Sequence, residues 1–489
     1  MTTNIKTLDS QYIANTYSRY PVQIVDGEGS ILTDENGKHY IDLGSGIGVN
    51  IFGQKDPAWI EAVQTQLHRF QHTSNLYYSA PDAELAEFLC ERTGLKKVFF
   101  SNSGAEANEC AIKAARAYAA AKKGKEWNTI VTLRDSFHGR TLTTLAATGQ
   151  DMFHQDFLPL TPGFVHAEPD DLEGLKQIVR ENRVAGILIE CVQGEGGVRA
   201  LSDAYVKGVS ELCEKEDIVF MTDEVQCGNG RTGKLYAYEH YGVLPDVVST
   251  AKGLGGGLPI GATMLGKKVE NVFTPGKNGS TFGGNPIVCA GALSILKRLD
   301  DKFLAEVTRK GNFVKEYLAG KPGIERISGL GLMIGVKTVK SENEVVAKMM
   351  ENGVLALTAH GGMVRLLPPL NISDADLKKA LVTCCLPQRP ESPAESDSFR
   401  QAKARGKHSA GFLFASEMKR NPCRYRACFF TAESNSSSAF ATRSNVFFAS
   451  AGISALAAFF AASSFFSFTA AAGRGAVLSP KAPGRLPAS

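Results

Sequence analysis

The chain has 489 residues, of which 43% are hydrophobic and 21% charged, as is usual for a soluble globular protein of two or three domains. From Thr383 onward it carries 13 Lys and Arg against 5 Asp and Glu, so the preceding residues carry 41 against 45 and are mildly acidic. This balance gives no reason to expect a nucleic-acid partner. Six cysteines precede residue 383 without a CxxC pair or a Cys/His ligand spacing, which favours reduced cytosolic thiols over disulfides or a metal site. The first residues show no basic segment followed by an apolar run, so we expect no signal peptide, no membrane partner and a cytoplasmic location.

The first 50 residues read as a short helix followed by three strands. The strands are expected over 22–25, 30–34 and 39–43, with turn-forming residues between them. The glycine cluster at 44–48 permits close approach of the backbone to another group, although an ordinary loop can have the same composition.

From about residue 56, amphipathic helices alternate with apolar strands. This alternation predicts an α/β fold with a mainly parallel sheet covered on both faces. Ligands of such sheets bind at the carboxyl ends of the strands, so the residues that follow each strand are the candidates for a site. The expected helices are 57–70, 80–93, 105–122 and 287–299, and the expected strands are 97–101, 129–133, 186–190, 218–222 and 247–250.

One lysine stands at such a strand end. Lys252 follows the apolar strand 247–250 and precedes a run of glycines, so a planar ligand can approach it closely. An amine that is partly desolvated there has a lowered pKa and can form a Schiff base. Taken alone, Lys252 is better interpreted as a surface lysine before a flexible loop.

Two further strand ends carry candidate ligand-binding residues. After strand 97–101, Ser103 and Glu106 have the spacing of a capping box, and a helix start with free N–H groups is also an anion site. After strand 129–133, Phe137 offers a ring face and Arg140 a fork for a carboxylate. Each motif has an ordinary alternative, namely a plain helix cap, a core phenylalanine and a surface ion pair.

Three more segments follow the same pattern. Glu190 and Glu195 follow a very apolar strand, and Asp223 ends another strand, where a carboxylate can hold a cationic ring nitrogen. The small-residue loop 279–286 can bind phosphate through Thr281 and its backbone. Polar strand ends and an ordinary loop are the alternatives when each is taken separately. Together, however, the motifs supply the amine, acid, ring face and phosphate cradle that pyridoxal 5′-phosphate requires.

In motif order and spacing, residues 10 to 381 resemble the class III, fold type I aminotransferases, and within that family the acetylornithine aminotransferases. The resemblance implies an α/β fold type I transferase, with a large domain built on a mainly parallel seven-stranded sheet and a smaller α+β domain drawn from both chain ends. The implied limits are 1–50 for the first part of the small domain, 51–285 for the large domain and 286–382 for the rest of the small domain. The motifs that carry the resemblance are 102–108 (NSGAEAN), 136–141 (SFHGRT), 193–197 (QGEGG), 222–226 (TDEVQ), 251–254 (AKGL) and 280–285 (STFGGN).

The resemblance also implies roles toward the cofactor pyridoxal phosphate. Lys252 forms the Schiff base and then moves the proton during catalysis. Asp223 pairs with the pyridine nitrogen, Phe137 stacks on the ring and Gln226 lies near its 3′-oxygen. The phosphate is held by Ser103, Gly104 and Ala105 and, from the partner subunit, by Thr281, so the resemblance implies a homodimer with a shared active site.

Substrate binding is implied for four further residues. Arg140 binds the carboxylate of the amino-acid substrate, and Ser280 accompanies Thr281 from the partner subunit. Arg365 receives the α-carboxylate of 2-oxoglutarate. Glu195 masks Arg365 while the other substrate is bound, which lets one site accept two differently shaped molecules.

The implied reaction belongs to arginine biosynthesis. N2-acetylornithine and 2-oxoglutarate would give N-acetylglutamate 5-semialdehyde and glutamate in two half-reactions. His138 and the compact N-terminal region favour this donor over ornithine, while 4-aminobutyrate is the main competitor and succinylated donors fit the same motifs. A cofactor-binding relic that no longer turns over is the alternative outside enzyme function.

The helical pattern is expected to stop near Leu381, and residues 383–489 are atypical for the family. Residues 446–472 carry no charge, so a membrane anchor and a regulatory extension are two interpretations of this tail. We favour a third, a translated wrong reading frame, because the periodicity ends in the middle of a helix. On that interpretation the tail is disordered or poorly packed.

Overall fold

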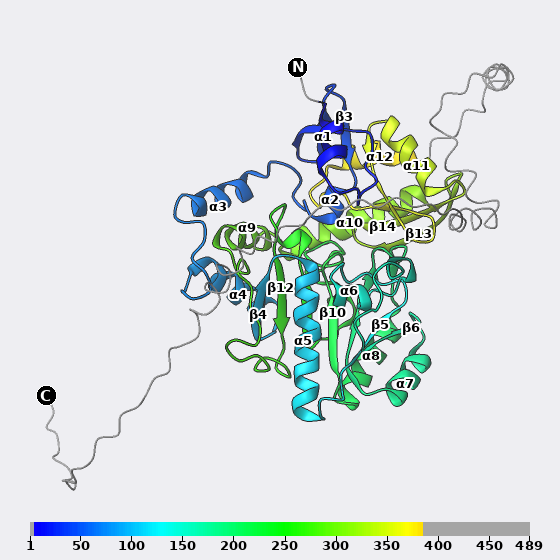
Figure 1. Ribbon diagram of the computed structural model, residues 1–489. Helices are drawn as coiled ribbons and strands as arrows, with labels where there is room; N and C mark the ends of the chain where they lie inside the picture. Colours follow the sequence, from blue (N-terminus) through cyan, green and yellow to red (C-terminus); the bar gives the residue numbers. More distant parts are fainter. Residues whose placement is uncertain (1–3, 385–489) are drawn as a thin grey trace, which may run out of the picture. The chain divides into compact units, whose positions relative to one another are not determined.

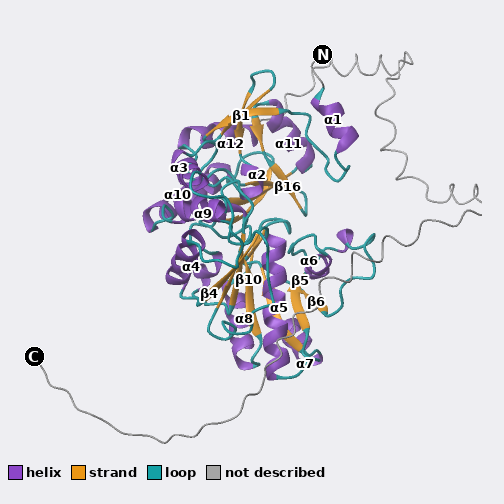
Figure 2. Ribbon diagram, turned by 60° about the vertical axis from the view of Figure 1, so that its left-hand side comes forward, coloured by secondary structure: helices purple, strands orange, loops and turns teal. Residues whose placement is uncertain are grey.

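The computed structural model describes residues 4–384, and the predictions made for 385–489 lie outside the described residues. A seven-stranded sheet lies at the centre of its larger part, as Figures 1 and 2 show. Neighbouring strands run parallel except around β12, which is antiparallel to both β11 and β4. The predicted mainly parallel sheet is confirmed. Its order is β4 (Lys97–Ser101), β12 (Gly261–Leu265), β11 (Val247–Thr250), β10 (Val219–Asp223), β7 (Val184–Ile189), β5 (Thr129–Leu133) and β6 (Phe164–Ala167).

Helices pack on this sheet through apolar side chains. Helix α5 (Gly104–Lys122) crosses the sheet in cyan in Figure 1, and its alanines pack against apolar residues of β5, β7, β10 and β11 in one cluster. A second, larger cluster contains the apolar face of α8 (Asp203–Lys215) together with Val131, Ile187 and Phe220. Because strand residues alternate between the two faces, both faces of the sheet are buried. The other helices of this part are α3 (Pro57–Leu67), α4 (Ala80–Thr93), α6 (Leu142–Ala147), α7 (Leu172–Glu181), α9 (Pro286–Leu296) and the 3-10 turns η1 (Asp151–Phe153), η2 (Ala237–Tyr241) and η3 (Lys252–Leu254).

One smaller four-stranded sheet joins segments from both ends of the described chain, and a second is built from β13 (Ile324–Leu330), β14 (Met333–Thr338), β17 (Met363–Leu366) and β16 (Leu357–Ala359) alone. Strand β15 (Val354–Leu355) pairs in parallel with β3 (His39–Asp42), which follows β1 (Ile24–Glu28) and β2 (Ile31–Asp34). The division into domains at residues 50, 285 and 382 stays a prediction. The remaining elements are α1 (Ile5–Tyr12), α2 (Ser45–Gly48), β8 (Val192–Gln193), β9 (Arg199–Ala200), α10 (Asp301–Leu318) and α11 (Glu342–Glu351).

The last described helix corrects one prediction. Helix α12 (Asp374–Cys384) continues three residues beyond Leu381, where we expected the pattern to stop. Leu377, Ala380 and Leu381 are buried, and the helix contacts α10 and α11. Packing against these helices therefore carries the helix past Leu381 despite the β-branched residues that follow. None of the helices between residues 4 and 384 combines the length and apolar character needed to span a bilayer.

Candidate functional site

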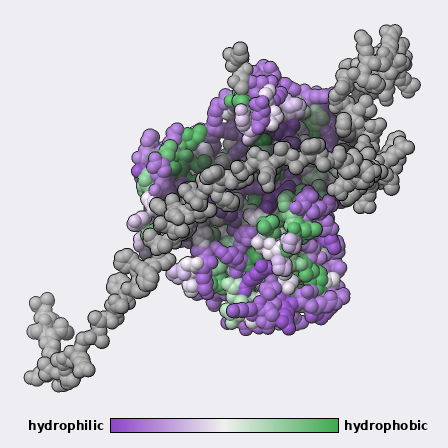
Figure 3. Space-filling model, in the orientation of Figure 1, coloured by the Kyte–Doolittle hydropathy of each residue, from purple (hydrophilic) through white to green (hydrophobic). Residues whose placement is uncertain are grey.

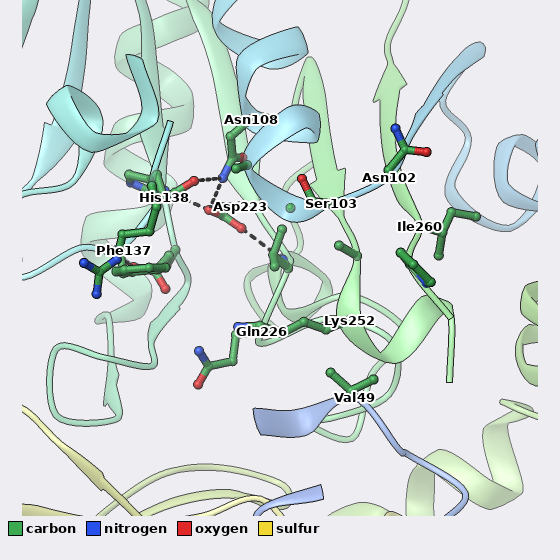
Figure 4. A pocket seen from close by; sticks show the side chains of 18 of the residues that line it. Val49, Asn102, Ser103, Asn108, Phe137, His138, Asp223, Gln226, Lys252 and Ile260 are labelled. Atoms are coloured by element: carbon green, nitrogen blue, oxygen red, sulfur yellow. Dashed lines mark hydrogen bonds and ion pairs between the residues drawn. The ribbon is translucent and has the colours of Figure 1, made fainter. Parts of the chain in front are cut away.

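A cavity of about 460 Å³ lies at the carboxyl ends of the central strands. Residues that follow five different strands line it: Ser103 after β4, Phe137 after β5, Glu190 after β7, Asp223 at the end of β10 and Lys252 after β11. Figure 4 shows how several of these side chains surround the cavity. The parallel sheet thus brings together residues that lie up to 149 positions apart, from Ser103 to Lys252.

Lys252 stands at the start of η3 with a left-handed backbone, at a φ of 45°. A residue other than glycine adopts that conformation only where the surrounding structure imposes it. Burial of the amine lowers the pKa of Lys252, and the nearby Arg365 cation lowers it further, while the carboxylates of Glu195, Asp223 and Glu190 oppose the shift. The lowered pKa makes the neutral, nucleophilic amine available at lower pH than in an ordinary lysine.

The Asp223 carboxylate is buried and held from three sides. Its Oδ2 accepts a hydrogen bond from Asn108 Nδ2 at 2.6 Å and lies 2.8 Å from His138 Nδ1, while Oδ1 accepts from the Val225 backbone N–H at 3.0 Å. Ser249 Oγ donates to Asn108 Oδ1 and so fixes the amide. These contacts, drawn in part in Figure 4, place a carboxylate of defined orientation on the cavity wall.

The start of helix α5 forms an anion cradle. Ser103 caps the helix by accepting from the Glu106 N–H at 3.2 Å, and the Glu106 carboxylate reaches back to the Asn102 N–H at 2.8 Å. Ser103, Gly104 and Ala105 line the cavity, so the helix start faces into it. A Cβ on Gly104 would stand only 2.6 Å from a methyl carbon of Val225, which explains the glycine. The N-terminal partial charge of α5 suits a phosphate here.

Phe137 and Arg140 lie on the side of the cavity formed by the loop after β5. The Phe137 backbone N–H donates to Glu190 Oε2 at 3.0 Å, which ties this loop to the end of β7. Burial raises the pKa of Glu190 to about 7. The exposed Arg140 guanidinium lies over the Phe137 ring at 5.4 Å and over the Phe153 ring at 4.0 Å, measured from its central carbon to the ring centroids.

Arg365 joins the site through Gln226. Its Nη1 donates to Glu195 Oε1 at 2.7 Å and to Gln226 Oε1 at 2.9 Å, and Gln226 lines the cavity. The Arg365 side chain is buried in strand β17, whereas the Glu195 side chain keeps 29% of its surface exposed. The more exposed partner of such a pair has room to turn away and release the guanidinium.

Two of the predicted site residues lie elsewhere. Ser280 and Thr281 line a separate surface hollow together with Ser74, Asn75 and Leu76. Ser280 Oγ accepts from Asn102 Nδ2 at 3.2 Å, which keeps its loop beside the residue before the anion cradle. Within one subunit, therefore, Thr281 does not line the Lys252 cavity.

A comparison with known protein families decides the family. The model of the family described as "Aminotransferase class-III" matches residues 12–384. The chain belongs to the class-III aminotransferases.

Relatives and solved structures agree with this assignment. The class-III aminotransferase described here is 49% identical over 379 residues to an acetylornithine aminotransferase of Haemophilus ducreyi, an alignment that covers 77% of this chain and 96% of the relative. It is 43% identical over 381 residues to that of Caldanaerobacter subterraneus, with the same coverage. An ornithine aminotransferase from Toxoplasma gondii, with PLP at partial occupancy at its active site, superposes with a TM-score of 0.74 at 33% identity, covering 78% of this chain and 93% of that one.

The sequence did not point to every residue of this aminotransferase site. Asn108 supports Asp223 and lies one helical turn beyond Gly104, so a buried asparagine on an otherwise alanine-lined helix face was an available signal. His138 was noticed only as a family marker, although its ring contacts Asp223. Phe153 lies 13 residues after Arg140 in an irregular segment and had no sequence signal.

Proposed function

We propose that this class-III aminotransferase transfers the amino group of N2-acetylornithine to 2-oxoglutarate, giving N-acetylglutamate 5-semialdehyde and glutamate. One observation carries the proposal: a lysine and a buried carboxylate share a cavity whose lining residue Gln226 contacts the Glu195–Arg365 ion pair. This arrangement serves a reaction in which two different carboxylates visit one site. The identity to acetylornithine aminotransferases supports the choice of donor.

The residues of the cavity fit pyridoxal phosphate. When bound, the cofactor supplies an aldehyde for amines and a ring that withdraws electrons from the reacting carbon. Lys252 offers the amine, Asp223 a fixed negative charge for the ring nitrogen, and Phe137 a ring face. Ser103, Gly104 and Ala105 offer N–H groups and a hydroxyl to the phosphate.

Lys252 also moves the proton. With the cofactor bound, the Lys252 amine would act as the base toward the carbon that bears the substrate's amino group. Burial lowers the pKa of this amine, so the neutral form that can take the proton from that carbon is more available than in an ordinary lysine. The Glu195, Asp223 and Glu190 carboxylates then stabilise the lysine cation that results.

Arg140 and Arg365 bind the carboxylates of different substrates. Arg140 binds the carboxylate of the amino donor at the mouth of the cavity. Arg365 stays paired with Glu195 during that half-reaction, and Glu195 turns away when 2-oxoglutarate brings its own α-carboxylate. Glu195 is half-buried and contacts Arg365 through one oxygen, so a substrate carboxylate that replaces it leaves the buried guanidinium with an anionic partner.

A donor assay tests this function. The purified protein is given pyridoxal phosphate and 2-oxoglutarate with N-acetylornithine, ornithine or 4-aminobutyrate, and glutamate formation is followed. We expect kcat/KM for N-acetylornithine to exceed that for each other donor by about tenfold or more. A higher kcat/KM with ornithine or 4-aminobutyrate would transfer the assignment to that donor, and no glutamate from a folded protein would mark an inactive relic.

We further propose that the enzyme is a homodimer that works in the cytoplasm. Leu76, Tyr77 and Tyr78 are exposed by 85%, 71% and 108%, and they adjoin the hollow that contains Thr281. A second subunit seated there would bury these side chains and carry Thr281 to its partner's phosphate. Cys90, Cys110, Cys191, Cys213, Cys227 and Cys289 are free thiols, and all but Cys90 are buried, which suits a reducing compartment.

A further inference from the structure

Arg140 is oriented by an aromatic ring that the proposed function does not use. Its guanidinium carbon lies 4.0 Å from the centroid of Phe153, closer than the 5.4 Å that separates it from Phe137. Within residues 4–384, Arg140 has no hydrogen-bond or ion-pair partner, and its side chain is exposed. Stacking on Phe153 is therefore the main restraint on an otherwise mobile cation.

Phe153 is itself fixed by the fold. The neighbouring His154 is buried, and its Nε2 lies 2.9 Å from the carbonyl oxygens of both Leu145 and Thr148 at the end of α6. A ring N–H between these carbonyls satisfies the helix end and anchors η1 at the same time. The Phe153 ring then meets the Phe137 ring edge to face, at 6.1 Å and 82°.

One more contact ties this segment to the cavity. Gln150, which precedes η1, donates from Nε2 to the Ser136 carbonyl at 3.0 Å. Ser136 immediately precedes Phe137, so the loop that carries Phe153 and the loop that carries Phe137 and Arg140 are held together. The Phe153 ring thus has a defined place relative to the cavity.

Stacking engages the face of a guanidinium and leaves its edge, with the N–H groups, free for a carboxylate. We propose that Phe153 is a positioning residue that holds Arg140 with this edge toward the donor carboxylate, and that it thereby sets the preference for donors that carry one. The inference rests on the proposed role of Arg140. It adds a specificity element from a part of the chain outside all the recognised motifs.

Kinetics with two matched donors test the inference. N-acetylornithine and N-acetyl-1,4-diaminobutane have the same length and reactive amine, but only the first has a carboxylate. Phe153→Leu keeps an apolar side chain and removes the ring face, whereas Phe153→Tyr keeps the face. We expect Phe153→Leu to raise KM for N-acetylornithine about tenfold with kcat nearly unchanged, and to leave the diamine unaffected. Phe153→Tyr should behave as the parent enzyme.

An unchanged ratio of the two kcat/KM values in Phe153→Leu would overturn the proposal, and an equal loss of activity for both donors would mark a merely structural role. If kcat/KM for N-acetylornithine falls relative to that for the diamine in Phe153→Tyr as well, the proposal is also contradicted, because Phe153→Tyr keeps the ring face.

A binding measurement separates this inference from the proposed reaction. N-acetylnorvaline has the carboxylate of N-acetylornithine but lacks its reactive amine, so calorimetry on the holoenzyme reports binding without turnover. Phe153→Leu should raise its Kd about tenfold and Phe153→Tyr should not. If no donor were turned over while this difference persisted, the proposed function would fail and the role of Phe153 would stand. Normal turnover with equal Kd values for all three proteins would leave the proposed function standing and contradict the role of Phe153.

Discussion

At the residue scale, Asp223 shows how the fold prepares one charge. Hydrogen-bond donors from helix α5, from the loop after β5 and from the chain just beyond β10 converge on its carboxylate. Burying a carboxylate costs free energy unless its oxygens accept hydrogen bonds. With these bonds in place, it becomes a fixed negative charge in surroundings of low polarity. A protonated pyridine nitrogen is the natural partner for that charge.

The charge of Asp223 is therefore testable on its own. Asp223→Asn keeps the shape and can still meet Asn108, but it cannot stabilise a ring cation. We expect kcat to fall roughly 10²- to 10³-fold while the cofactor still binds, as judged by its visible absorbance. Asp223→Glu, which keeps the charge, should recover part of the loss. An Asp223→Asn enzyme within tenfold of the parent would show that the charge is not needed.

Glu190 predicts a pH dependence of stability. Burial raises its pKa from 4.5 to about 7, so the folded protein keeps a proton that the unfolded chain has lost between these values. The free energy of unfolding should then fall as pH rises from 4.5 to about 7, by up to about 1.4 kcal/mol per pH unit for this proton. In Glu190→Gln the fall should be smaller, as followed by denaturant unfolding at several pH values. Glu211→Gln, at an exposed position of α8, is the matched control and should keep the parent slope.

The residues that sequence could predict are those with a strong local signal. Lys252, Asp223 and Phe137 each follow an apolar strand, and a parallel sheet gathers such positions at one edge. Asn108 and Phe153 act through contacts made only in the folded chain, with Asp223 at a separation of 115 residues and with the Arg140 side chain. The helical pattern marks Asn108 as a polar residue on an apolar face, but it does not identify Asp223 as its partner, and nothing in the pattern marks Phe153.

At the element scale, the start of helix α5 depends on close contact with the turn after β10. Gly104 is the first residue of the helix, and Val225 packs where its side chain would be. Alanine favours helices more than glycine does, so propensity alone would predict a gain from Gly104→Ala. The steric contact with Val225 predicts instead that Gly104→Ala disturbs the helix start and weakens phosphate binding there.

We accordingly expect Gly104→Ala to shift the helix start and to raise the Kd for pyridoxal phosphate about tenfold or more. Gly104→Ala combined with Val225→Ala removes the clashing methyl groups and should recover most of the affinity, while Val225→Ala alone should change it little. Cofactor titration by absorbance gives all four constants. Failure of the double variant to recover would mean that the glycine is required for another reason.

Some elements were predicted with their bounds, and two strands of the large sheet were not predicted individually. Helix α4 and strands β4, β5 and β11 begin and end where expected. Strands β6 and β12 were missed among the individual elements: β6 has only four residues, and β12 begins with a glycine after a glycine-rich loop. Both owe their conformation to pairing with a neighbouring strand, which no local pattern specifies. Helix α12 likewise extends beyond its sequence pattern because of a tertiary contact, its packing on α10 and α11.

At the scale of the whole molecule, one subunit keeps Thr281, which we propose as part of the site, outside its own Lys252 cavity. Thr281 lines the surface hollow beside Leu76, and hydrophobic side chains also reach the surface over α3 in Figure 3, where Leu67 is 46% exposed. Sequence reasoning assigned Thr281 to the partner's site by resemblance alone. A site shared between subunits requires that Thr281 and Lys252 of one chain lie in different hollows, as they do here.

Mixing two inactive variants tests the shared site. Lys252→Ala removes the amine, and Thr281→Asp places a negative charge where we propose a phosphate. If Thr281 acts across the dimer, the mixed dimer has one site with both defects and one intact site. Random reassembly then yields about one quarter of the parent activity. No recovery in dimers whose two subunits carry different affinity tags and copurify through both would mean that Thr281 acts within its own chain or not at all.

The central claim is that the Lys252 cavity holds pyridoxal phosphate and passes an amino group in two separable halves. The most direct measurement is the visible absorbance of the holoenzyme during addition of N-acetylornithine without an acceptor, followed by 2-oxoglutarate. The account predicts that the band of the lysine-bound cofactor disappears with one equivalent per site and returns with 2-oxoglutarate, and that Lys252→Ala shows neither change. A folded holoenzyme whose band ignores N-acetylornithine, or a Lys252→Ala variant that responds like the parent, would contradict it.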